Sequence, residues 1–244
     1  LELSSAASDV YKRQEEETKS RNLNFFDATC PLVTKVHMEV IKHAKAGRDI
    51  ILIGHEGHPE VEGTMGRHIN NDNSSIYLVQ NENDANSIKL NKKNELAVVT
   101  QTTLSVDETK SIISILRDRF PKIITPKKDD ICYATQNRQD AVKQLALESD
   151  FMIVVGSKNS SNSNRLKELG ENCGCKSVLI DEFNDLDLDV IKKFSRISIT
   201  AGASAPESKV MEIAQSLESF IGAEISEYGE DNEDIFFKLP PGLR

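Results

Sequence analysis

The sequence predicts an α/β protein made of two similar units, each with a parallel sheet and flanking helices. Short apolar segments alternate along the chain with longer segments whose apolar residues recur at helical spacing. One short segment, Phe151 to Val155, is apolar at every position, which is typical of a parallel strand buried on both faces. The alternation starts afresh after Pro126, so we expect two units that meet near this residue.

The pattern places the strands and helices in chain order. Strands are expected over residues 49–54, 76–79, 95–100, 151–155, 177–180, 196–200 and 234–239. Helices are expected after Pro31, after Ser105, through Ala141 and Ala146, after Asn164, and from Val210 to Ile221. Glu108, three residues after Ser105, completes a capping-box signature for the second of these helices.

Four polar loops follow predicted strands, at the edge where parallel sheets bind ligands. They are rich in hydroxyls, amides and backbone N–H groups, which suit a phosphate. Each loop alone is most simply a surface connection, whereas four together favour an anion site. The loops are His55 to Thr64, Gln101 to Ser105, Ser157 to Asn164 and Ala201 to Ala205.

Composition excludes several classes of protein. The 244 residues are enough for one large or two ordinary cores. The net charge of −9, with no basic stripe, argues against a nucleic-acid partner, and no apolar run suggests a membrane span. The cysteines are too few and too irregular for a secreted disulfide framework, which favours a reducing, cytoplasmic setting. They are Cys30, Cys132, Cys173 and Cys175.

Cys30 lies where a helix is expected to begin. Pro31 suits the first helical position, apolar residues recur from Val33 to Ala44, and Gly47 ends the run. Unpaired N–H groups at a helix N-terminus favour a thiolate, which can attack a substrate or bind a metal. A small buried apolar residue is an equally good interpretation of Cys30 from its position alone.

Six motifs in register resemble one family. They run from Phe26 to Val33, Gly57 to Thr64, Thr100 to Ser105, Asp130 to Thr135, Gly156 to Asn164 and Thr200 to Pro206. On these motifs the chain resembles the 4-hydroxy-3-methylbut-2-enyl diphosphate reductases, the LytB or IspH family, from about Glu15 to Arg244. The resemblance implies an iron–sulfur oxidoreductase of the non-mevalonate isoprenoid pathway. Its reaction is the two-electron reductive removal of an allylic hydroxyl, giving isopentenyl and dimethylallyl diphosphates.

The resemblance also implies a cofactor and an electron donor. Family members hold a 4Fe–4S cluster by three cysteines, and Cys30 and Cys132 match the second and third of these ligands. The donor would be a ferredoxin or a flavodoxin. Cys173 and Cys175 match no ligand position and lie where we expect a turn from helix to strand.

Substrate contacts follow from the same motifs. By resemblance, His58 would contact the diphosphate and Glu60 would deliver protons, which a carboxyl can do if burial raises its pKa toward neutrality. Thr102 and Thr103 would lie near the reacting end of the substrate, and Ser160, Ser161, Asn162 and Ser204 would hold the diphosphate. Plainer interpretations are a solvated loop carboxylate for Glu60, a loop or core histidine for His58, and helix caps for Ser160 to Asn162.

The chain departs from the family at its beginning. The family starts with a Gly-Phe-Cys-Ala-Gly-Val motif that carries the first cluster cysteine, followed by two diphosphate-binding histidines, and none of these is present. We therefore expect two units of a three-unit, pseudo-threefold architecture, in a sequence truncated at the front. The expected parts are a non-native or disordered leader (1–14), a remnant of the first unit (15–30), the second unit (31–128), the third unit (129–222) and a segment returning toward the first (223–244). Alone, this polypeptide is expected to bind iron–sulfur poorly and to be inactive.

Two other functions fit the loops. One is a metal-free α/β phosphate-binding transferase, and the other is a non-catalytic module that binds a diphosphate without chemistry. The chain lacks the Gly-x-Gly-x-x-Gly fingerprint and the Walker pattern, which weakens any nucleotide-binding version of either alternative.

Overall fold

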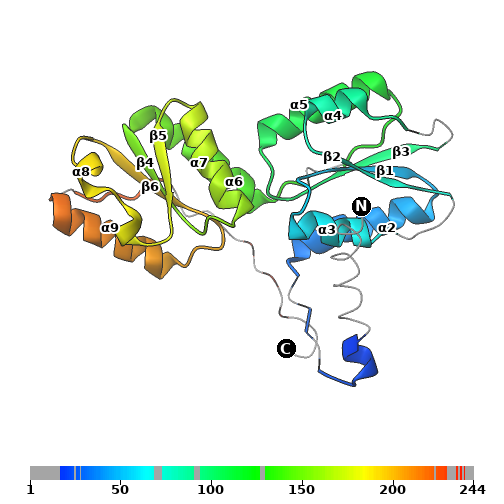
Figure 1. Cartoon of the computed structure of the whole chain (residues 1–244), viewed down its shortest axis with the longest axis horizontal. Coiled ribbons are helices and arrows are strands. Elements are labelled where there is room, and N and C mark those ends of the chain that lie inside the picture. The colour runs from blue at the N-terminus through cyan, green and yellow to red at the C-terminus, as the bar shows by residue number, and fades with distance from the viewer. Residues whose placement is uncertain are drawn as a thin grey trace. The chain divides into compact units, whose positions relative to one another are not determined.

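The chain forms two compact α/β units (Figure 1). The computed structural model describes residues 17–24, 26–27, 29–68, 73–90, 94–126, 130–222, 224–229, 235, 237 and 239. Of these, the first unit takes the residues up to Thr102, those from Val106 to Cys132, and residues 235, 237 and 239. The second unit takes Thr103 to Ser105 and the residues from Tyr133 to Gly229. Within the described residues, no helix is both long and apolar enough to cross a membrane.

The first unit is a three-stranded parallel sheet in the order β2-β1-β3. Its strands are β1 (Asp49–Ile53), β2 (Ile76–Val79) and β3 (Leu96–Thr100), with Asp49 aligned to Leu96 and Ile50 to Ile76. All residues of β1 and β3 are buried, as expected for strands covered on both faces. Its helices are α2 (Pro31–Lys45), α3 (Pro59–Gly66), α4 (Glu82–Ser87) and α5 (Val106–Arg119).

The alternation of side chains along β1 divides the core of the first unit into two layers. Ile50 and Leu52 pack with Val36, Val40 and Ala44 of α2 and with Val61 of α3. Figure 1 shows α2 and α3 on this face of the sheet, with α4 and α5 on the other. Helix α2 begins after Cys30 with Pro31 in its first turn, as predicted from the sequence.

The second unit repeats this arrangement in the order β5-β4-β6. Its strands are β4 (Phe151–Val155), β5 (Lys176–Ile180) and β6 (Ile197–Ala201), with Phe151 aligned to both Lys176 and Ile197. Ile153 packs toward α9 and Val154 toward α6 and α7, so β4 is buried on both sides. The helices are α6 (Tyr133–Glu148), α7 (Ser161–Asn172), the short η1 (Phe183–Asp185) and α8 (Leu188–Ile191), and α9 (Glu207–Ile221).

The structure differs from the sequence-based expectation at one of the polar loops. Residues 55–64 are not a loop throughout, because α3 begins at Pro59 after His58 caps its first turn. The signal is the same as at Cys30 and Pro31, but the helix has only eight residues and a weak apolar pattern. The short helices α4, η1 and α8 were likewise not expected, since helices of this length carry too few apolar positions to show a period.

Two expected segments lie at the ends of the chain. The leader, residues 1–14, falls outside the described residues. The closing strand, residues 234–239, falls on a stretch where only Ile235, Phe237 and Leu239 are described, and none of these three is in a strand.

We predict that Gly202→Ala destabilises the second unit whereas Gly63→Ala does not destabilise the first. A Cβ at Gly202 would overlap the buried side chain of Ser163, so we expect the free energy of unfolding to fall by about 1–3 kcal/mol. Gly63 lies in α3, where an added Cβ would be 3.8 Å from its nearest neighbour, His37 Nε2, so alanine should be neutral or stabilise by up to about 1 kcal/mol. Urea unfolding of both variants measures this, and destabilisation of equal size at the two positions would contradict the packing.

Candidate active site

In the first unit, the loops that follow β1 and β3 are held together at the carboxyl edge of the sheet. The side chain of Gln101, which is buried, accepts a hydrogen bond from the backbone N–H of His55 at 3.1 Å. Gly54 permits close packing here, since a Cβ at this position would lie 2.5 Å from a methyl group of Val61. These contacts fix the entry to α3, which carries two of the predicted site residues.

His58 and Glu60 share the first turn of α3. His58 is the N-cap residue, and its Nδ1 accepts a hydrogen bond from the backbone N–H of Glu60 at 3.2 Å. Burial lowers the pKa of the His58 imidazole, and the nearby His55 lowers it further. The ring is therefore neutral at pH 7, and its proton is on Nε2, which is a hydrogen-bond donor. His58 is half-buried, so it is a capping residue and can still offer this donor to a ligand.

Glu60 is bonded to Thr102 at the end of β3. Its Oε1 accepts a hydrogen bond from the backbone N–H of Thr102 at 2.6 Å, and the Thr102 side chain contributes a further hydrogen bond. Burial raises the pKa of the Glu60 carboxyl, the bonds from Thr102 oppose this, and the negative charge of Asp130 adds to the increase. Glu60 is thus a partly buried carboxyl with a raised pKa, not the solvated loop carboxylate of the plainer interpretation.

The segment before Cys132 is attached to the same edge of the sheet. The backbone N–H of Cys132 donates to the carbonyl of Thr102 at 3.0 Å. Asp130 Oδ2 accepts from the backbone N–H of Thr100 at 3.2 Å, and Asp130 Oδ1 forms an ion pair with Lys35 Nζ of α2 at 3.1 Å. Burial raises the pKa of Asp130 by more than the Lys35 ammonium lowers it.

The two predicted metal ligands are both in the first unit. Cys30 is exposed at the N-terminus of α2, which rules out the interpretation of this residue as a buried apolar side chain. Cys132 is half-buried, and neither cysteine is in a disulfide. Within the residues that the structure describes, no group of three or more His, Cys, Asp or Glu side chains could hold a metal ion. These two cysteines therefore suit two positions of an iron–sulfur ligand set and do not make a complete set.

In the second unit, the loop between β4 and α7 forms a polar cradle. Ser160 is the N-cap of α7, and its side chain accepts from the backbone N–H of Ser163 at 3.3 Å. The amide of Asn162 is buried, and neither its oxygen nor its nitrogen has a hydrogen-bond partner among the described residues. Ser161 Oγ accepts from Thr103 Oγ1 at 3.4 Å. An unpaired buried amide at the start of a helix is suited to an anionic ligand.

The last of the polar loops follows β6. Its Gly202 packs on Ser163, as does Gly156 at the end of β4, so a Cβ at either glycine would overlap the Ser163 side chain. Ser204 lies two residues beyond Gly202 and is exposed. Arg138 of α6 donates from Nε to the carbonyl of Ala201 at 3.1 Å, which holds the end of β6 beside this loop. The structure thus brings Thr103, Ser160, Ser161 and Asn162 to one cradle and places Ser204 on a loop that packs against it.

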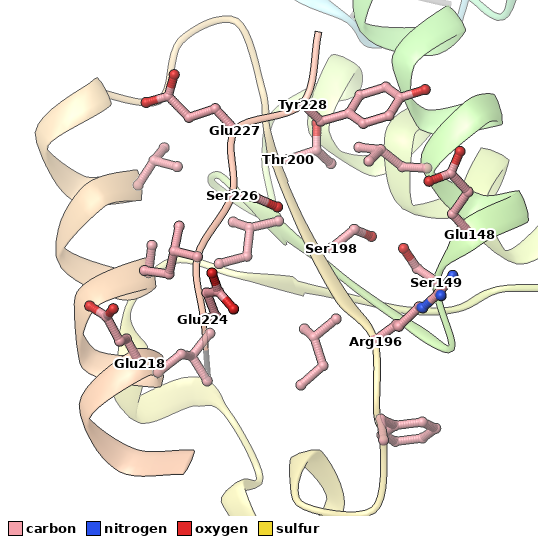
Figure 2. A pocket seen from close by; sticks show the side chains of 18 of the residues that line it. Glu148, Ser149, Arg196, Ser198, Thr200, Glu218, Glu224, Ser226, Glu227 and Tyr228 are labelled. Atoms are coloured by element: carbon pink, nitrogen blue, oxygen red, sulfur yellow. The ribbon is translucent and has the colours of Figure 1, made fainter. Parts of the chain in front are cut away.

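A cavity of about 1050 Å³ in the second unit is a different place from this cradle. Figure 2 shows it between β6, α9 and the extended segment 224–229, and Tyr228 of that segment hydrogen-bonds Gln144 at 3.1 Å. Four glutamates and a single arginine are among its lining residues, and none of the predicted site residues lines it within the described part of the chain. Because it is acidic, this cavity does not suit a diphosphate.

The turn containing Cys173 and Cys175 lies between α7 and β5, as predicted. Gly174 takes a left-handed conformation with φ of 86°, which allows the reversal from helix to strand. Cys175 is buried in the core of the second unit, and burial raises the pKa of its thiol.

Sequence reasoning missed three residues that shape the site. Gln101 and Asp130 lie within the motifs, but the motifs assign them no role, and Lys35 stands out by no local feature of α2. Only Asp130 could have been singled out from the sequence, because a carboxylate two residues before a predicted ligand cysteine is expected to have a charged or hydrogen-bonding partner. That partner, Lys35, is 95 residues away in sequence, and no local pattern could have identified it.

Comparisons with known proteins give one consistent result. The family model described as LytB protein matches residues 5–218, a range that includes part of the segment 1–14 for which the sequence motifs showed no likeness. The chain is 53% identical to a 4-hydroxy-3-methylbut-2-enyl diphosphate reductase of Alcanivorax borkumensis, over 98% of this chain and 77% of that protein. It is 51% identical to the reductase of the same name from Psychrobacter arcticus, over 98% of this chain and 75% of that protein.

A solved structure supports the fold. The E-1-hydroxy-2-methyl-but-2-enyl-4-diphosphate reductase of Plasmodium falciparum matches with a TM-score of 0.85 and 36% identity, over 93% of this chain and 71% of that one.

We predict that the stability difference between Glu60→Gln and the unsubstituted chain depends on pH. From the ordinary carboxyl pKa of 4.5 up to the raised pKa, the folded chain holds a proton that the unfolded chain has released, so stability falls as pH rises. Glu60→Gln has no such proton. The difference in melting temperature, Glu60→Gln minus the unsubstituted chain, should therefore become more positive as the pH rises from 4.5 toward neutral. Thermal melts of both proteins across this range check the sign, with Glu56→Gln as the control for loss of an exposed carboxylate from the same loop.

Proposed function

Because the chain belongs to the LytB family, we propose that it carries the site of a 4-hydroxy-3-methylbut-2-enyl diphosphate reductase. In this reaction the allylic C–O bond breaks, two electrons and two protons are taken up, the oxygen leaves as water, and an allylic C–H bond forms. The products are isopentenyl and dimethylallyl diphosphates, and the electrons would come from a ferredoxin or a flavodoxin. The partly buried Glu60, held by Thr102 beside the segment of Cys132, is the observation that carries the proposal.

Cys30 and Cys132 are the residues of this chain that would hold a 4Fe–4S cluster. When bound, the cluster supplies the electrons and a Lewis acid. The accessibility of Cys30 and the attachment of Cys132 to Thr102 support this assignment. As the chain offers two thiols here, we propose that it needs a further ligand for a stable cluster.

Glu60 is the proposed proton donor. Since its Oε1 accepts the N–H of Thr102, the proton is held on Oε2, where it can pass to the departing oxygen. Burial keeps this proton bound at a higher pH than in a solvated carboxyl. The Thr102 hydroxyl, bonded to the same carboxyl, would orient it and lie next to the reacting end of the substrate.

Each unit offers neutral donors of the kind that bind a diphosphate. In the first unit His58 offers Nε2–H. In the second unit Asn162 offers an unpaired amide N–H, and the first turn of α7 offers backbone N–H groups. Ser160, Ser161, Thr103 and Ser204 add hydroxyls. An ionic ligand gains more from such preformed donors than from flexible surface side chains, because no reorganisation is needed when it binds.

Turnover tests the proposed reaction. We expect the product of the whole gene, reconstituted without oxygen with iron and sulfide, to form both products with reduced methyl viologen as electron donor. Glu60→Gln should lower kcat by about 10²–10³-fold, because general acids contribute on this scale. Glu56→Gln, which removes an exposed carboxylate from the same loop, should leave kcat unchanged. Activity that survives both Cys30→Ser and Cys132→Ser would favour the metal-free transferase instead.

We expect Asn162→Ala to weaken substrate binding without removing the chemistry. Loss of a hydrogen bond to a charged group costs about 1.5–3 kcal/mol, so KM should rise roughly 10–100-fold while kcat changes less. Asn159→Ala, on the exposed part of the same loop, is the matched control and should leave KM unchanged. Steady-state kinetics with varied substrate separates the two parameters. An unchanged KM in Asn162→Ala would place the diphosphate elsewhere.

A further inference from the structure

One ion pair joins the two segments that carry the predicted cluster ligands. Lys35 lies on α2, in the second turn after Cys30, and Asp130 lies two residues before Cys132. Lys35 Nζ and Asp130 Oδ1 are 3.1 Å apart. The pair therefore connects the start of α2 to the segment of Cys132, although these are 95 residues apart in the chain.

Asp130 makes a second bond that orients the same segment. Its Oδ2 accepts from the backbone N–H of Thr100, the last residue of β3. Two residues later the N–H of Cys132 donates to the carbonyl of Thr102. The segment from Asp130 to Cys132 is thus fixed at both ends to the carboxyl edge of the sheet, and Lys35 connects this fixed segment to α2.

Because Asp130 is buried, this ion pair contributes little net stability to the fold. The Asp130 side chain has no exposed surface, whereas the Lys35 side chain is 43% exposed. Taking a carboxylate out of water is costly, and one half-exposed ammonium repays that cost only in part. Well-packed apolar residues often stabilise as much, so what the pair adds is directional: it fixes where two chain segments meet. Glu39 of α2 and Glu60 of α3 also interact with Asp130, and because both are carboxylates neither replaces Lys35 as its partner.

We propose that Lys35 and Asp130 form a positioning clamp that holds the thiols of Cys30 and Cys132 at a fixed separation before any metal binds. The clamp rests on the proposed function, because it assumes that these two thiols act together. Neither residue is catalytic in this proposal. Lys35 acts through Asp130, and Asp130 acts through the backbone that carries Cys132.

The test measures the separation of the thiols in the metal-free chain. Dibromobimane, which bridges two neighbouring thiols, is added to the whole chain in the presence of a chelator and without oxygen, and peptide mapping identifies the bridged cysteines. We expect Cys30 and Cys132 to be bridged in the unsubstituted chain. Lys35→Met should slow the bridging at least about tenfold, because a misplacement of about 1 Å can slow reactions between held groups by up to about 10²-fold. Lys35→Arg keeps the charge and should restore most of the rate.

Two further variants separate positioning from general stability. Asp130→Asn keeps an acceptor for the Thr100 N–H and loses the charge, so bridging should slow as in Lys35→Met; it also serves if Lys35→Met does not fold. Arg48→Met breaks the ion pair of Arg48 Nε with Glu95 Oε2, 2.8 Å apart near the amino ends of β1 and β3, and should leave the bridging rate unchanged.

The clamp is wrong if Cys30 and Cys132 are not bridged in the unsubstituted chain. It is also wrong if Lys35→Met and Asp130→Asn lower the melting temperature yet keep the bridging rate, because the pair would then be structural only. The bridging assay needs neither iron nor substrate. A protein that shows the clamp but no reductase turnover would therefore contradict the proposed function alone, and turnover with a bridging rate insensitive to Lys35 would contradict the clamp alone.

Discussion

The backbone of Thr102 connects Glu60 of the first unit to the segment of Cys132. Its N–H donates to Glu60 and, on the other side of the residue, its carbonyl accepts from Cys132. The bond to Glu60 depends on β3 ending beside β1. Glu60 lies on α3, which follows β1 in the chain, and Thr102 follows β3. A parallel sheet places the carboxyl ends of its strands at one edge, and this alignment brings together residues that are far apart in sequence, such as Glu60 and Thr102, 42 positions apart.

The two units share a topology, but their predicted site side chains differ in whether they have hydrogen-bond partners. In the first, the acid and Asp130 are bonded to backbone N–H groups that end β3. In the second, Asn162 leaves both ends of its amide without a partner among the described residues. An unpaired buried polar group costs about 1–3 kcal/mol, and a diphosphate, which accepts hydrogen bonds, can remove that cost at the amide nitrogen. Under the proposed function, the first unit would hold a proton and the second would receive an anion.

Much of the fold was predictable because burial leaves a strong pattern. The five apolar residues of β4 and the Pro31 start of α2 are local signals, and the structure confirms both. Short elements were not predictable, because α3 owes its start to the His58 cap and has too few apolar positions to show a period. For the site, resemblance identified residues such as Glu60 and Asn162, but their environment came from the fold. The burial of Glu60 depends on Thr102, and the partner of Asp130 lies on a helix 95 residues earlier.

An acidic chain can still bind a diphosphate, because the selection is local. The net charge of −9 repels an anion at long range, but salt screens charges that are more than about 10 Å apart. At contact distance the second unit offers the start of α7 and the amide of Asn162, whose dipoles are fixed by the helix and by burial. The acidic cavity beside β6 shows the opposite case in the same unit, where carboxylates line the space and a diphosphate is disfavoured. Under the proposed function, neutral donors at strand ends would let one small unit accept an anion at one place and reject it at another, without a cluster of basic side chains.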